Sequence, residues 1–123
     1  MNKRVLYVDD EVINLELFKI NFRNEFEIFI ADSAQKGLEI LKDEEIDVII
    51  SDLKMPHMNG MELIERIKKE NPEKICILLT AFMESDVMLR AINEELVYRY
   101  IMKPWKKDEL REIINSAFKR IEK

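Results

Sequence analysis

The sequence predicts a single α/β domain over residues 1–123, in which five parallel strands form one sheet with helices on both faces. Two observations support this prediction. Short apolar runs rich in β-branched residues alternate with helix-periodic segments five times along the chain. Alternation of this kind is typical of parallel sheets with right-handed crossovers. The doubly wound strand order 2-1-3-4-5 is the most probable topology for such a chain.

The predicted strands are short, and four of them are followed by a polar or charged residue. The third strand is the clearest, because the run VIIS stops abruptly at Asp52 and a turn with Met55-Pro56 and Asn59-Gly60 follows. An unbroken run of Val and Ile is typical of a strand that is buried on both faces. The five predicted strands cover residues 4–8, 26–31, 46–51, 75–79 and 98–102.

The predicted helices lie between these strands and after the last one. Ser33 is a plausible N-cap for the second helix, and Asn71-Pro72 ends the third. The first helix has Val12, Leu15 and Ile20 among its apolar positions. The five predicted helices cover residues 11–24, a segment that begins after Ser33, and residues 59–70, 84–96 and 107–121.

Composition and charge exclude several classes of protein. A net charge of −5 argues against direct nucleic-acid binding, which needs a basic patch. No apolar run is long enough to span a membrane, and the acidic start of the chain does not fit a signal peptide. The single cysteine, Cys76, excludes an intrachain disulfide and fits the reducing cytoplasm. The sequence thus favours a cytoplasmic domain.

Polar side chains gather at the carboxyl ends of the predicted strands, which all lie at one edge of a parallel sheet. Three carboxylates in one place repel each other unless a cation lies between them. Carboxylate oxygens suit Mg²⁺, and a lysine and a hydroxyl nearby would complete a site for a phosphoryl group. The residues concerned are Asp9, Asp10, Asp52, Thr80 and Lys103.

Four segments at these strand ends resemble the receiver domains of bacterial two-component response regulators. They are VDDE after the first strand, SDLKMPHMNG after the third, LLTA after the fourth and YIMKPW after the fifth. Each is a weak signal alone, but four in order along the whole chain are specific. The resemblance implies a flavodoxin-like fold of the CheY-like type.

The resemblance also implies a role for each residue of the metal site. Asp10 would bind Mg²⁺ directly, and Asp9 would act through water. Asp52 and the backbone carbonyl of Lys54 would complete the set of protein ligands.

For the phosphoryl group, the resemblance makes Asp52 the acceptor from a kinase phosphohistidine. Lys103 and Thr80 would bind the phosphoryl oxygens, and Thr80 with Tyr100 would form the switch. The peptide bond between Lys103 and Pro104 would be cis.

The implied partners are a sensor histidine kinase or a histidine phosphotransfer domain, and an output domain or partner protein. The fourth helix, fifth strand and fifth helix would form the face that carries the signal, and this face could also form a homodimer on phosphorylation. The receiver would be an acceptor with slow autodephosphorylation, not a turnover enzyme. Phe82, two residues after Thr80, is expected to shield the phosphoryl group from water.

Other functions and structural roles remain possible at this stage. A phosphatase of the haloacid dehalogenase type also uses Asp, Thr, Lys and Mg²⁺, but its nucleophile ends the first strand in an Asp-x-Asp pattern. A flavodoxin-like electron carrier would need a hydroxyl-rich phosphate loop where this chain has DDEVIN. A receiver that is never phosphorylated and only binds partners is the third alternative. Asp9 and Asp10 could simply cap a helix, His57 fits a solvated loop, and Cys76 fits an inert core thiol.

Overall fold

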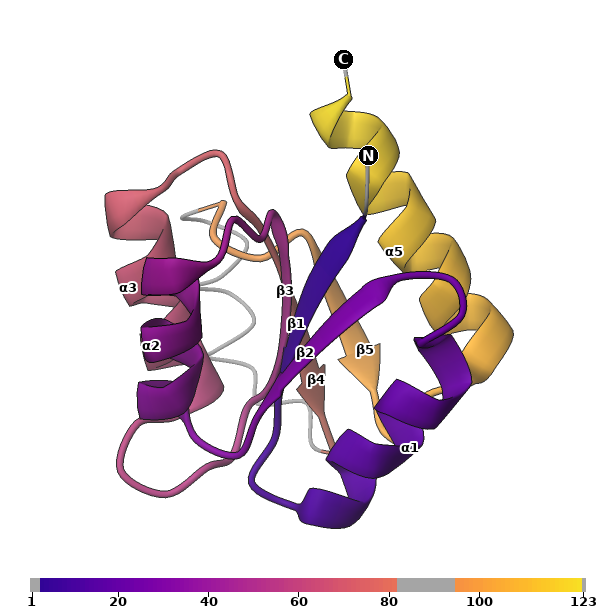
Figure 1. The fold of residues 1–123 in the computed structure, drawn as a ribbon. Coiled ribbons are helices and arrows are strands. Elements are labelled where there is room, and N and C mark those ends of the chain that lie inside the picture. The colour runs from indigo at the N-terminus through magenta and orange to yellow at the C-terminus, as the bar shows by residue number, and fades with distance from the viewer. Residues whose placement is uncertain (1–2, 82–94, 123) are drawn as a thin grey trace.

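The computed structural model describes residues 3–81 and 95–122, and strands alternate with helices along these segments (Figure 1). The strands and helices, in chain order, are β1 (Arg4–Val8), α1 (Val12–Phe22), β2 (Glu27–Ala31), α2 (Ala34–Asp43), β3 (Val48–Asp52), α3 (Gly60–Glu70), β4 (Ile75–Thr80), β5 (Arg99–Met102) and α5 (Lys107–Ile121). The observed ends differ from the predicted ends by at most two residues. The predicted helix over residues 84–96 falls largely outside the described residues, and Phe82 lies outside them.

The five strands form one parallel sheet in the order β2-β1-β3-β4-β5, which confirms the predicted topology. Strand β3 is central, and its residues pair with β1 on one side and with β4 on the other. The register places Val8 beside Ser51 and Asp52 beside Leu79, so the strands end at a common edge. The side chains that follow these ends are therefore brought to one rim of the sheet.

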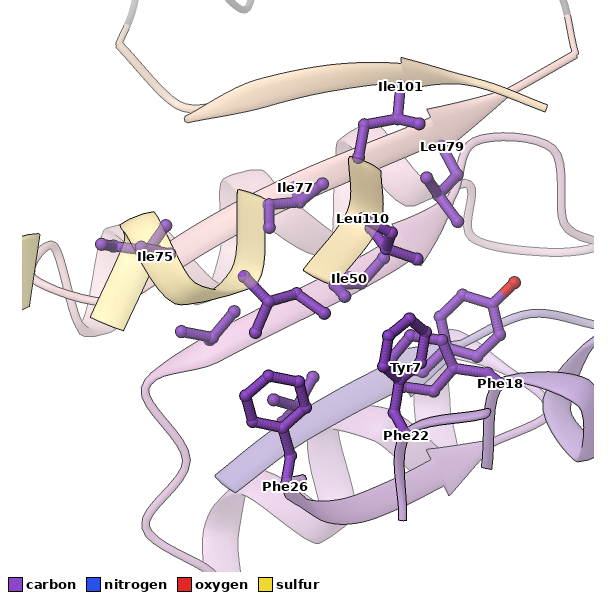
Figure 2. Packing of buried hydrophobic residues seen from close by; sticks show 14 of the residues in the cluster. Tyr7, Phe18, Phe22, Phe26, Ile50, Ile75, Ile77, Leu79, Ile101 and Leu110 are labelled. Atoms are coloured by element: carbon purple, nitrogen blue, oxygen red, sulfur yellow. The ribbon is translucent and has the colours of Figure 1, made fainter. Parts of the chain in front are cut away.

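Two apolar cores cover the two faces of the sheet. Helices α1 and α5 pack on one face, and α2 and α3 pack on the other (Figure 1). Alternate residues of each strand serve the two cores, because successive side chains of a strand point to opposite faces. Tyr7 and Ile50 join Phe18, Phe22 and Leu110 under α1 and α5 (Figure 2). Burial of each such side chain contributes about 1.5–3 kcal/mol to stability.

Helix α1 buries only some of the apolar positions that its sequence offered. Leu15 and Phe22 are buried together with Phe18, whereas Val12 and Ile20 are 61% and 58% exposed. The helix has apolar residues all round, so its own periodicity does not select a core face. Packing of the aromatic side chains against β1 makes that selection.

The turn after β3 holds Asp52 at the rim. The Gly60 amide donates to the Leu53 carbonyl at 2.8 Å, and the Leu53 amide donates to the Leu79 carbonyl at 2.8 Å. Asn59 and Glu62 form a reciprocal capping box at the start of α3, and Ser33 caps α2 as predicted. These bonds fix the backbone on both sides of the turn.

No helix among the described residues is long and apolar enough to cross a membrane.

Gly60 is required by the close approach of α3 to the end of β3. A Cβ atom on residue 60 would lie 2.2 Å from the Asp52 carbonyl oxygen. Gly60→Ala is therefore expected to lower the free energy of unfolding by about 3 kcal/mol, measured by urea denaturation, because backbone atoms must move.

Gly37→Ala is the matched control for this variant. A Cβ at residue 37 would lie 3.2 Å from the Val8 Cγ2 methyl and at ordinary contact distance from Leu6 and Ala31, so a side-chain shift of a few tenths of an ångström accommodates it and no backbone atom is in the way. The gain in helix propensity offsets this contact, so the control is expected to stay within about 1 kcal/mol of the wild type. Equal losses in the two variants would show that the turn imposes no special constraint.

Candidate functional site

The sheet brings the predicted site residues to the same rim. Asp9 directly follows β1, Asp52 is the last residue of β3, and Thr80 is the last residue of β4. Lys103 follows β5, and its backbone amide donates to the Thr80 carbonyl at 2.9 Å. The carboxyl edge of an open parallel sheet is where ligands bind in this class of fold.

Asp9 is completely buried and its carboxylate accepts four hydrogen bonds. Its Oδ1 accepts from the backbone amide of Glu11 at 3.0 Å. Its Oδ2 accepts from the Tyr7 hydroxyl at 2.8 Å, from Asn14 Nδ2 at 3.2 Å and from Lys103 Nζ at 3.1 Å. A buried carboxylate needs such donors, because an unpaired buried charge is very costly.

Lys103 links the two most buried carboxylates of the site. Its Nζ lies 3.1 Å from Asp9 Oδ2 and 3.2 Å from Asp52 Oδ1. Burial disfavours the charged ammonium, but the hydrogen bond to Asp9 and the attraction of Asp52 outweigh it, so the pKa of Lys103 is raised. The side chain is therefore a fixed positive charge between two acids.

Asp52 lies in an environment that disfavours its ionised form. Burial raises the pKa of its carboxyl group, Lys103 opposes this effect, and the charges of Asp9 and Asp10 raise the pKa further. One lysine thus does not balance the negative charges that meet here. An added cation would favour the ionised form of Asp52.

The three carboxylates are close enough to share one ion. One carboxylate oxygen from each of Asp9, Asp10 and Asp52 lies within 4.8 Å of the others. Asp10 is exposed and lines a pocket of about 370 Å³ together with Lys54, Met55, Pro56 and Asn59. This donor set of oxygens beside an open pocket fits Mg²⁺, which retains water while it binds carboxylates.

The remaining predicted residues lie around this cluster. Thr80 is buried at the end of β4, and the Lys103–Pro104 peptide bond is cis. The buried Tyr100 hydroxyl has no hydrogen-bond partner among residues 3–81 and 95–122, and burial raises its pKa. Lys54 is exposed beside Asp10.

Sequence reasoning missed two donors to Asp9, namely Tyr7 and Asn14. Residues two apart in a strand point to the same face, so a tyrosine two positions before Asp9 was a usable signal. Asn14 lies in the first turn of α1, five residues after Asp9. By contrast, His57 is exposed in the loop after β3, and burial raises the pKa of Cys76 to about 12, as a core thiol requires.

Comparison with known proteins identifies the family. A family model described as response regulator receiver domain matches residues 5–115. The chain belongs to this family. Receiver domains are phosphoacceptors rather than turnover enzymes, so the haloacid dehalogenase alternative does not apply.

Two curated relatives illustrate the range of this family. The hydrogenase transcriptional regulatory protein HoxA of Bradyrhizobium diazoefficiens is 31% identical over 113 residues, which cover 92% of this chain and 23% of HoxA. The sporulation initiation phosphotransferase F of Bacillus subtilis is 30% identical over 117 residues, which cover 94% of each protein. The receiver thus spans about a quarter of some relatives and nearly all of another.

Solved receiver structures have the same fold. The signal receiver domain of an HD domain-containing protein from Pseudomonas fluorescens is 29% identical, with a TM-score of 0.94 over 99% of this chain and 98% of that one. The response regulator TrrA from Thermotoga maritima, solved in complex with Mg²⁺-BeF, is 30% identical with a TM-score of 0.82. The match with TrrA covers 94% of this chain and 98% of TrrA.

The charge imbalance at the rim predicts a stabilising variant. The pKa of Asp52 is raised above its ordinary value of 3.8, so the folded protein binds this proton more readily than the unfolded chain does. Ionised Asp52 then lowers the free energy of unfolding at neutral pH. Asp52→Asn is expected to raise that free energy at pH 7 without divalent cations. The gain should shrink as the pH falls through the raised pKa of folded Asp52, and it should be lost once the pH is below 3.8.

Urea denaturation at several pH values measures this difference. Asp32→Asn is the control, since Asp32 is an exposed acid that pairs with Lys36 at 3.0 Å. Its loss should cost at most about 1 kcal/mol. A loss of stability in Asp52→Asn at pH 7 would contradict the electrostatic account of the site.

Proposed function

We propose that this receiver accepts a phosphoryl group on Asp52 from the phosphohistidine of a sensor kinase or a histidine phosphotransfer domain. The observation that carries the proposal is the Asp52 carboxylate beside Lys103 Nζ, at 3.2 Å, within a cluster of three acids. A carboxylate oxygen of Asp52 attacks phosphorus, the P–N bond of the donor breaks, and its electron pair returns to the imidazole. The product is an aspartyl phosphate.

The residues that would hold Mg²⁺ are Asp10, Asp52 and the backbone carbonyl of Lys54, with Asp9 acting through water. Bound there, Mg²⁺ would neutralise negative charge on the site and on the phosphoryl oxygens. The acidic donor set and the adjacent pocket support this assignment, as does the Mg²⁺-BeF complex of the related TrrA.

Lys103 and Thr80 are proposed to bind the oxygens of the transferred group. Lys103 already contacts Asp52 Oδ1, so a small movement brings its ammonium to a phosphoryl oxygen. Thr80 would contribute its hydroxyl, and Tyr100 would move inward in response. These new contacts would shift the balance between two conformations of the face formed by the predicted fourth helix, β5 and α5. Water would later hydrolyse the aspartyl phosphate slowly.

The signal would pass from that face to an output domain or partner protein, with a homodimer on phosphorylation as one route. Residues 1–123 would act as one receiver domain in the cytoplasm, without direct contact to nucleic acid or membrane. Receiver domains in this family interact with kinases and output domains, which supports this general scheme.

The exposed face of α1 is proposed to receive the phosphodonor. The helix begins directly beyond the acidic rim, and four large apolar side chains are exposed along it: Val12, Ile13, Leu17 and Ile20. Exposed apolar patches of this kind mark interaction sites. A donor helix packed on this face would bring its phosphohistidine to the acids at the start of α1.

Acetyl phosphate provides the direct test of the acceptor. Wild-type protein incubated with acetyl phosphate and Mg²⁺ is expected to gain one phosphoryl group by intact mass. Asp52→Asn and a reaction with excess chelator should gain none, whereas Asp32→Asn should react like the wild type. A gain that survives Asp52→Asn would identify a different acceptor, and no gain in the wild type would favour a module that only binds partners.

The α1 surface has a separate test that uses both kinds of donor. A panel of sensor kinases is first screened for the one that phosphorylates the wild type fastest. Ile13→Lys is expected to slow phosphotransfer from that kinase by about tenfold or more, because the loss of one buried apolar contact costs about 1.5–3 kcal/mol. Phosphorylation by acetyl phosphate should not change. Equal effects with both donors would show that α1 is not a docking surface.

A further inference from the structure

The Tyr7 hydroxyl is a buried polar group that the proposed phosphotransfer does not use. It is completely buried, and it donates to Asp9 Oδ2 at 2.8 Å. Lys103 Nζ contacts the same oxygen at 3.1 Å. The tyrosine therefore bonds directly to one acid of the site, and it shares the accepting oxygen with the lysine.

The position of this hydroxyl is fixed by aromatic packing. The Tyr7 ring stacks on Phe18, with 4.4 Å between ring centroids (Figure 2). Phe18 also meets the Trp105 ring edge-on, with 6.1 Å between centroids. The stacked ring therefore holds the hydroxyl beside Asp9, to which it donates its proton.

The hydroxyl is not needed to fill the core. A phenylalanine at residue 7 would make the same stacking contacts and would leave no polar group to desolvate. A hydroxyl kept at this position must find a partner, and its partner here is Asp9. The hydrogen bond to Asp9 therefore offsets the cost of burying the Tyr7 hydroxyl, and this bond belongs to the site and not to the apolar core.

We propose that Tyr7, held in place by its stacking on Phe18, is a positioning residue for the cation site and acts through Asp9. Its hydroxyl helps to fix the orientation of the Asp9 carboxylate and supplies a donor to Oδ2, so that Lys103 can be shared between Asp9 and Asp52. Without this donor, Asp9 Oδ2 draws Lys103 more strongly to itself, and the carboxylate keeps only its bonds to the Glu11 amide, Asn14 and Lys103. The inference rests on the proposed Mg²⁺ site.

Calorimetric titration with magnesium chloride tests this role in the full chain. Tyr7→Phe removes only the hydroxyl and is expected to weaken Mg²⁺ binding by about tenfold, the lower end of the effect seen when a partner of a metal-site group is lost. Tyr98→Phe is the matched control, because its hydroxyl, just before β5, bonds to Ser116 of α5 at 2.6 Å and not to the site. It should leave Mg²⁺ affinity unchanged.

Trp105 gives a spectroscopic readout that requires no metal. It is the only tryptophan, and its ring meets Phe18, on which Tyr7 stacks, so a site that rearranges in Tyr7→Phe should change its emission in metal-free protein. Emission in Tyr98→Phe should match the wild type. A purely structural role would lower the melting temperature of Tyr7→Phe without altering Mg²⁺ affinity, and that result would overturn the inference.

Two further outcomes separate this inference from the function on which it rests. If the wild type fails to bind Mg²⁺, the proposed metal site is wrong, whereas wild-type binding with unchanged affinity in Tyr7→Phe refutes only the positioning role. If Tyr7→Phe does not fold, Phe18→Leu, which removes the ring that holds Tyr7, is measured by the same calorimetry. It should weaken Mg²⁺ binding by a smaller factor, and unchanged affinity there would also refute the role.

Discussion

The contact of Lys103 with two buried acids is the interaction on which this receiver depends. Asp9 and Asp52 come from different strands, and a single ammonium lies 3.1 Å from one and 3.2 Å from the other. Asp10 adds a third carboxylate within 4.8 Å. One positive charge cannot balance three negative ones in a partly buried site, so the electrostatics of the rim favour an added cation.

The parallel sheet makes this concentration of charge possible. Strands that run in one direction all end at one edge, and the turn closed by Gly60 lets α3 begin almost against the Asp52 carbonyl. The two apolar cores supply the stability that the acids reduce. In this molecule the central strands are buried throughout, and the cost of the charged rim is confined to residues at or beyond strand ends.

The buried aromatic cluster under α1 connects the core to the rim. Phe18 stacks on Tyr7, and Tyr7 bonds to Asp9, so packing and electrostatics meet at one side chain. The other face of α1 is apolar and exposed beside the same rim. If both proposals hold, one helix serves the donor on its outer face and steadies the acid site through its inner face.

The sequence by itself determined the strand order, the edge at which Asp9, Asp52, Thr80 and Lys103 meet, and the Ser33 cap of α2, because these depend on local periodicity and chain direction. Tertiary structure alone decided which face of α1 is buried and which donors Asp9 receives. An apolar helix has no unique core face until aromatic partners pack against it. Likewise, the bonds that Lys103 makes to Asp9 join residues 94 positions apart, a distance in sequence that no local pattern encodes.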